Sequence, residues 1–121
     1  MPNPSVLIAD DSEDFAEMLK LLLETQGANC SVAHTGAAAL DAMRSRNFDL
    51  VVLDVGLPDI DGLEVARRAR RLNSPPLRLV GLSGYSRPRG AEEAGFDAYF
   101  VKPLSPETLA ALLPRADRGH P

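Results

Sequence analysis

The sequence has few aromatic residues, a single cysteine and no long apolar run. Aromatic residues make up 5% of the 121 residues, so a core must be largely aliphatic. One cysteine, Cys30, cannot form an internal disulfide, which favours a reducing, cytoplasmic setting. No apolar stretch approaches the roughly 20 residues that a membrane-spanning helix needs. The opening residues 1–4 also lack the basic and apolar regions of a signal peptide.

Positive charge is also in short supply. The formal net charge is -4, which argues against general nucleic-acid binding, because that activity needs a basic surface. Hydrophobic residues make up 45% of the chain, which is enough for a core. The length predicts one domain over residues 1–121, with its core at about 5–114 and a polar tail at 115–121.

Five short apolar runs alternate with segments suited to helices. The expected strands are residues 6–9, 30–34, 50–53, 77–82 and 98–101, and the expected helices are residues 13–26, 36–46, 62–72 and a last one that begins after Ser105 and ends by Pro114. This alternation predicts an α/β fold with a doubly wound, five-stranded parallel sheet and right-handed crossovers. The expected strand order is the flavodoxin-like 2-1-3-4-5.

The segment after the fourth expected strand is poorly suited to a helix. Pro88 and Gly90 lie in the only place where a fourth helix could form. Relative to alanine, they oppose a helix interior by roughly 3 and 1 kcal/mol. We therefore expect this helix to be short, with one or two turns at about 88–94, or the segment to be disordered.

Reactive side chains stand where four of the five strands end. They are Asp10 with Asp11, Asp54, Ser83 and Lys102. In a doubly wound sheet these ends share one edge, where ligands bind. Three nearby carboxylates attract a hard divalent cation, and oxygen-only ligands suit Mg²⁺. Asp54 could then act as a nucleophile toward a phosphoryl group, which Ser83 and Lys102 would stabilise.

From about residue 6 to residue 113, these motifs resemble the receiver domains of two-component response regulators. Asp10-Asp11 is similar to the acidic pair of that family, and Asp54 is similar to its phosphoacceptor. Ser83-Gly84, Lys102-Pro103 and Tyr99, three residues before the lysine, stand in the family's order and spacing. The local sequence at residues 56–58, 83–85 and 94–97 is similar to that of receivers of hybrid histidine kinases, although a stand-alone regulator fits as well.

The resemblance implies a mechanism. A phosphohistidine on a histidine kinase or a histidine phosphotransfer protein would donate to Asp54. Mg²⁺ would be held by Asp11, Asp54 and the backbone carbonyl of Gly56, with Asp10 acting mostly through water. Ser83 and Tyr99 would be the switch residues, with Ser83 moving toward the phosphoryl group. Such a domain is no conventional enzyme, because it assists only its own phosphorylation and dephosphorylation. The family usually has a cis peptide bond at the position of Lys102-Pro103.

Three other functions are open at this point. A phosphorylation-independent scaffold is favoured by the weak fourth helix, which belongs to the usual output face, and opposed by the intact acidic site. An aspartate-nucleophile phosphatase needs a second aspartate two residues after the nucleophile, where Gly56 stands. A flavin-binding module needs a Ser/Thr/Gly-rich phosphate loop, but four of the five residues 10–14 are acidic and would repel a phosphate unless a metal intervened.

The remaining polar residues have structural interpretations. We expect Asp59 and Asp61 to be turn and helix-cap residues rather than metal ligands. His34, at the end of an edge strand, is not expected to carry phosphate. The basic run of Arg67, Arg68, Arg70 and Arg71 predicts a solvated helix face, with a Glu64–Arg68 ion pair.

Overall fold

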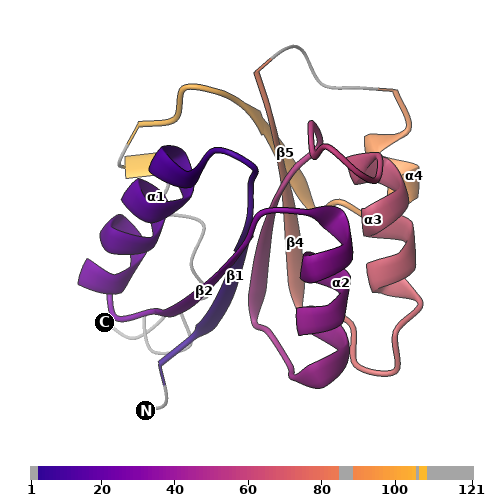
Figure 1. Ribbon diagram of the computed structural model, residues 1–121, viewed down its shortest axis with the longest axis horizontal. Helices are drawn as coiled ribbons and strands as arrows, with labels where there is room; N and C mark the ends of the chain where they lie inside the picture. Colours follow the sequence, from indigo (N-terminus) through magenta and orange to yellow (C-terminus); the bar gives the residue numbers. More distant parts are fainter. Residues whose placement is uncertain (1–2, 85–88, 106, 109–121) are drawn as a thin grey trace, which may run out of the picture.

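A computed structural model describes residues 3–84, 89–105 and 107–108, and its centre is a five-stranded parallel sheet (Figure 1). The strands are β1 (Ser5–Ala9), β2 (Asn29–Ala33), β3 (Leu50–Asp54), β4 (Arg78–Ser83) and β5 (Ala98–Val101). Their order is β2-β1-β3-β4-β5, and every neighbouring pair is parallel. The predicted fold class and strand order are therefore confirmed.

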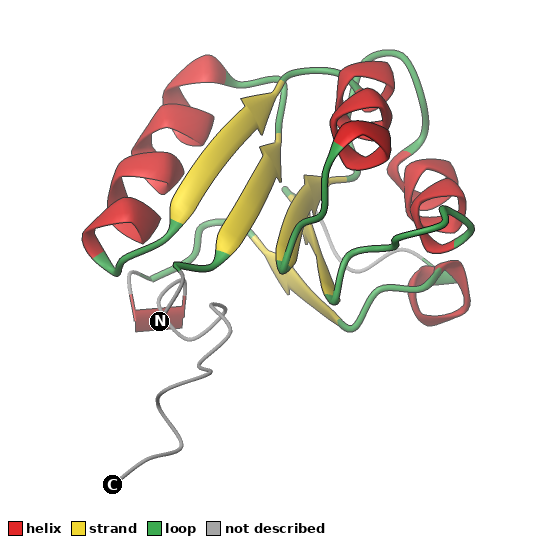
Figure 2. Cartoon of the chain, turned by 90° about the horizontal axis from the view of Figure 1, so that it is seen from below, coloured by secondary structure: helices red, strands yellow, loops and turns green. Residues whose placement is uncertain are grey.

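Helices cover both faces of this sheet. They are α1 (Glu13–Thr25), α2 (Gly36–Ser45), α3 (Gly62–Arg70) and α4 (Ala91–Ala94). Helix α1 packs on one face, and α2, α3 and α4 pack on the other, so the sheet lies between them (Figures 1 and 2). The side chains of Ser12, Thr35 and Asp61 cap the first three helices by accepting backbone N–H groups.

Strand β3 shows why the buried run of the sequence predicted the centre of the sheet. All five of its residues are buried. Leu50 and Val52 pack in the cluster on the α1 side, whereas Val51 and Leu53 pack in the cluster under α2 and α3. Because successive side chains of a strand point to opposite faces, a strand between two helical layers has to be apolar throughout. The run ends at Asp54, where the strand reaches the edge of the sheet.

The fourth helix is as short as predicted. Helix α4 comprises only four residues, between Gly90 (φ 84°) and Gly95 (φ 111°). The left-handed backbone at both glycines breaks the helical conformation on either side. Pro88 lies outside the described residues. So does most of the expected last helix, although its predicted cap is present, since Ser105 Oγ accepts the N–H of Thr108 at 3.1 Å.

The second strand begins and ends one residue earlier than the sequence predicts. His34 is expected to end β2, but that strand ends at Ala33, and the His34 ring lies against the Asp10 carbonyl instead. The sequence also lacks an apolar stretch long enough for a membrane-spanning helix. No helix in the described part of the chain is both long and apolar enough to cross a membrane.

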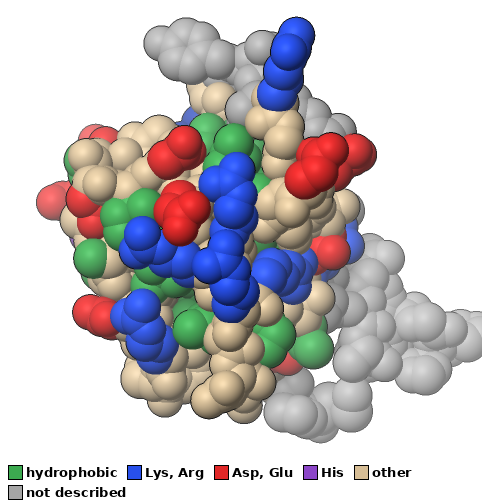
Figure 3. Space-filling model, turned by 90° about the vertical axis from the view of Figure 1, so that its right-hand side faces the viewer, with side chains coloured by type: hydrophobic (Ala, Val, Ile, Leu, Met, Phe, Trp, Pro, Cys, Tyr) green, Lys and Arg blue, Asp and Glu red, His purple; other side chains and the backbone are tan. Residues whose placement is uncertain are grey.

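Basic side chains form a stripe on the side covered by α2, α3 and α4, with acidic side chains beside it (Figure 3). The predicted Glu64–Arg68 pair is present at 2.9 Å. Arg70 departs from the predicted solvated face. Its guanidinium donates to the carbonyls of Gly95 and Pro76, each at 2.9 Å, and to Asp97 Oδ2 at 2.6 Å. Arg70 thus ties α3 to two connecting segments, a role that a helix-face pattern cannot reveal.

Candidate functional site

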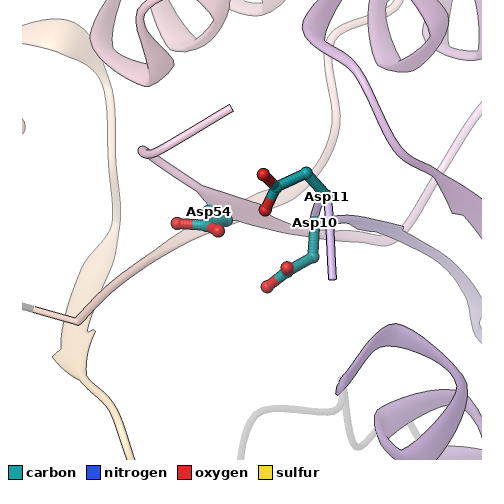
Figure 4. Close-up of side chains that lie close together, drawn as sticks. All are labelled: Asp10, Asp11 and Asp54. Carbon is teal, nitrogen blue, oxygen red and sulfur yellow. The ribbon is translucent and has the colours of Figure 1, made fainter. Parts of the chain in front are cut away.

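The carboxyl edge of the sheet brings the predicted site residues together. Asp10 and Asp11 directly follow β1, and Asp54 ends the neighbouring strand β3. One oxygen from each of these carboxylates lies within 4.8 Å of the others, and Figure 4 shows the three side chains grouped where the two strands end. Ser83 ends β4 and Lys102 follows β5, so both residues stand at the same edge of the sheet, and the role of Ser83 in the site stays a prediction.

Asp10 is the most constrained of the three carboxylates. Its side chain is 1% exposed, Oδ1 accepts the N–H of Ser12 at 2.8 Å, and Oδ2 accepts from Lys102 Nζ at 2.8 Å. Its backbone is held as well, because its N–H donates to Ala33 and its carbonyl lies 2.9 Å from His34 Nδ1. With both carboxylate oxygens already engaged, Asp10 is better placed to reach a cation through water than directly.

Asp54 is buried but only partly neutralised. Oδ1 accepts the N–H of Gly56 at 2.9 Å, and Oδ2 lies 3.6 Å from Lys102 Nζ. Loss of water raises the pKa of Asp54, and the charges of Asp10 and Asp11 raise it further. The Gly56 N–H and Lys102 act in the opposite direction but do not cancel the rise. An ionised Asp54 is therefore costly until another cation approaches it.

Lys102 is held by its backbone and by two kinds of neighbour. Its N–H donates to the carbonyl of Ser83 at 2.7 Å, and its peptide bond to Pro103 is cis, as the resemblance implied. Its Nζ reaches Asp10 and Asp54, and it also lies 4.2 Å from the centre of the Phe15 ring. No motif of the sequence linked Phe15 to the site, so its contact with Lys102 was missed.

The loop between β3 and α3 is fixed by structural aspartates, as predicted. Asp61 Oδ1 accepts the N–H of Leu63. Asp59 reaches a different helix, where it accepts the N–H groups of Gly36 and Ala37 at 2.7 and 2.9 Å. These two N–H groups hold the pKa of Asp59 below its usual range. Asp59 therefore anchors the loop that carries Gly56 to the start of α2.

Tyr99, the predicted switch residue, packs against the core on the side of α3 and α4. Its ring meets the Phe96 ring edge to face, with centroids 5.5 Å apart. It also covers Gly81, where an added Cβ would lie 2.4 Å from the Tyr99 ring. Gly81 is thus the residue that makes room for this ring position, and the switching role of Tyr99 stays a prediction.

The donor set suits a hard divalent cation. Asp10, Asp11 and Asp54 offer only oxygen atoms, and Asp11 is exposed and can be reached from solvent. Lys102 supplies one positive charge to a group of three carboxylates. A site of this composition gains from a further cation, and small hard ions prefer such ligands.

Comparison with known proteins agrees with this geometry. The model of the response regulator receiver domain family matches residues 6–114. The chain is 34% identical over 119 residues to the response regulator ArlR of Staphylococcus haemolyticus, covering 97% of this chain and 54% of that protein. It is 35% identical over 122 residues to the uncharacterized transcriptional regulatory protein YkoG of Bacillus subtilis, covering 99% and 54%. The chain therefore spans about half the length of these curated relatives.

Solved structures show the same fold. A CheY-like receiver domain from Methylobacillus flagellatus has a TM-score of 0.82 and 34% identity, over 88% of this chain and 92% of that one. A response regulator from Burkholderia pseudomallei, solved with a phosphorylated aspartic acid, a calcium ion and citrate, has a TM-score of 0.81 and 28% identity, over 93% and 67%. On the family match and these structural neighbours, the chain belongs to the response regulator receiver domains, the phosphoacceptor switches of two-component signalling.

Proposed function

We propose that Asp54 accepts a phosphoryl group from a phosphohistidine on a histidine kinase or a histidine phosphotransfer protein. The observation that carries this proposal is the arrangement around Asp54. The carboxylate is buried, grouped with Asp10 and Asp11, and 3.6 Å from the ammonium of Lys102. The phosphorylated aspartic acid in the Burkholderia pseudomallei relative supports the same chemistry on this fold.

We propose Mg²⁺ as the cation of the site. Asp11, Asp54 and the backbone carbonyl of Gly56 would hold it, and Asp10 would act through water because both of its oxygens are engaged within the protein. When bound, Mg²⁺ would offset the charge that the carboxylates and an incoming phosphoryl group bring together. The calcium ion in the Burkholderia pseudomallei relative supports a divalent cation as cofactor.

In the transfer itself, an oxygen of Asp54 forms a bond to phosphorus, and the bond between phosphorus and the histidine nitrogen breaks. The imidazole leaves with the electron pair, and Asp54 becomes an acyl phosphate. Ser83 would donate its hydroxyl to one phosphoryl oxygen and Lys102 its ammonium to another. The domain would assist only its own phosphorylation and dephosphorylation, and we propose a cytoplasmic setting in which Cys30 stays reduced.

Intact mass after incubation with acetyl phosphate and Mg²⁺ tests this proposal. We expect wild type to gain one phosphoryl group (~80 Da) and to lose this gain when EDTA is added first. Asp54→Asn should show no gain. Asp41→Asn is the matched control, because it removes the charge of an exposed carboxylate on α2, where Asp41 pairs with Arg44.

Two results would contradict the proposal. Wild type that gains no mass under any of these conditions would leave the scaffold hypothesis as the better account. A gain that persists in Asp54→Asn would place the phosphoryl group on another residue.

A further inference from the structure

The ammonium of Lys102 has one neighbour that the proposed function does not use. Its Nζ lies 2.8 Å from Asp10 Oδ2, 3.6 Å from Asp54 Oδ2 and 4.2 Å from the centre of the Phe15 ring. A cation within about 6 Å of a ring centre is attracted by the negative face of the ring. We infer that Phe15 is a positioning residue for phosphoryl transfer, which holds the Lys102 ammonium beside Asp54. This inference rests on the proposed function.

The Phe15 ring is itself well fixed. Phe15 is half-buried against the apolar cluster that α1 shares with the sheet. Its N–H donates to Ser12 Oγ at 3.2 Å, and the N–H of Ser12 donates to Asp10 Oδ1 at 2.8 Å. Ser12 is therefore hydrogen-bonded both to Asp10 and to Phe15, the two residues that contact Lys102 on this side. These two hydrogen bonds link the first turn of α1 to the acidic residues on this side of the site.

An aromatic ring suits this position better than other side chains. The start of a helix repels a cation, so Lys102 gains nothing from the nearby end of α1 itself. A carboxylate at position 15 would accept a hydrogen bond and compete with the phosphoryl oxygen for the ammonium. An aliphatic side chain has no negative face, so it would leave that side of the ammonium without an attractive partner. The ring attracts the charge without using any of its N–H donors.

The rate of phosphorylation by acetyl phosphate with Mg²⁺ tests this role in three variants. We expect Phe15→Leu to slow the reaction roughly three- to thirty-fold, and Phe15→Tyr, which keeps the ring, to stay within about two-fold of wild type. Phe100→Leu is the matched control. It makes the same change in a half-buried phenylalanine that packs against the same cluster. It should react at the wild-type rate.

A spectroscopic signature separates positioning from a loss of folding. The chain has two lysines, Lys20 and Lys102, so their ammonium groups can be resolved in a ¹H–¹⁵N spectrum. The Lys102 ammonium should show the upfield ring-current shift of a cation over an aromatic face. This shift should be lost in Phe15→Leu and kept in Phe15→Tyr and Phe100→Leu.

Distinct results overturn the inference and the proposed function. The inference alone would be overturned if Phe15→Leu were phosphorylated at the wild-type rate. It would also be overturned if Phe15→Leu and Phe15→Tyr lost the same fraction of that rate. A Lys102 resonance that does not respond to Phe15→Leu would do the same. Wild type that accepts no phosphoryl group would overturn the proposed function and the positioning role with it.

Discussion

Aspartates lie both at the edge of the sheet where the strands begin (the amino edge) and at the edge where the strands end (the carboxyl edge). Their negative charges are compensated differently at the two edges. At the amino edge, Asp49 accepts the N–H of Ser5 at 2.8 Å, and Asp97 accepts from Leu79 at 2.7 Å and from Arg70 at 2.6 Å. At the carboxyl edge, Asp10 and Asp54 share one lysine, and the exposed Asp11 lies beside them.

This difference separates structural aspartates from those available for chemistry. A carboxylate that has its own donors within the chain stabilises the fold, whereas a buried carboxylate that lacks sufficient positive charge opposes folding. The amino edge should therefore lose stability when its charges are removed. At the carboxyl edge, removal of a negative charge or addition of a cation should instead raise the stability of the folded chain.

Arg70→Met should have the largest effect on stability. It removes three hydrogen bonds that a guanidinium makes to Gly95, Pro76 and Asp97, so the free energy of unfolding should fall by about 2 to 3 kcal/mol. Urea unfolding followed by circular dichroism measures this. Arg71 is an exposed neighbour, and Arg71→Met should change the free energy of unfolding little. Phosphorylation by acetyl phosphate should persist in both variants. Its loss in Arg70→Met would show that the two edges are coupled.

Gly81→Ala tests a position between the edges, where packing rather than charge is at stake. The added Cβ would lie 2.4 Å from the Tyr99 ring, so that ring must move, at a cost of about 1 to 2 kcal/mol. Gly84→Ala is the matched control, because a Cβ there meets nothing within 4 Å. Thermal unfolding should show the same loss of stability in Gly81→Ala at low and at high salt. A salt-dependent loss would contradict a purely steric cause.

Magnesium should stabilise the carboxyl edge. At ten times its dissociation constant, a cation that binds only the folded chain raises the free energy of unfolding by about 1.4 kcal/mol. We expect this gain in wild type, a much smaller one in Asp11→Asn and Asp54→Asn, and the full gain in Asp41→Asn, which removes an exposed carboxylate from α2. Urea unfolding with Mg²⁺ or with EDTA measures the difference. An equal gain in all four proteins would place the cation elsewhere.

Asp54→Asn should raise stability by about 1 kcal/mol at neutral pH without Mg²⁺. Because burial raises the pKa of Asp54, the folded chain binds this proton more tightly than the unfolded chain does. The contribution of Asp54 to wild-type stability therefore falls as the pH rises from about 4, the usual pKa of an aspartate, through the higher folded-state pKa. The amide of the variant cannot ionise, so the two proteins should converge in acid. A constant difference across the pH range would contradict this cause.

Much of the fold and site could be predicted because the signals are local. The apolar run that ends at Asp54 predicts a central strand, and glycine and proline predict a short fourth helix. Asp10, Asp54 and Lys102 could be assigned to one site because parallel strands bring their carboxyl ends to one edge. Phe15 and Arg70 could not be placed in this way. Each lies in an ordinary helical pattern, and its partner is a residue from a distant segment.

The sequence by itself determined the order of strands and helices, the caps at Ser12 and Asp61, and which residue types meet at the carboxyl edge. Only the tertiary structure decided how their charges are shared. It joined Lys102 to Asp10 and Phe15, and it joined Asp59 to the start of α2. The physical reason is that periodicity and turn chemistry act between near neighbours in the chain. Desolvation and ion pairing instead depend on which distant segments pack together.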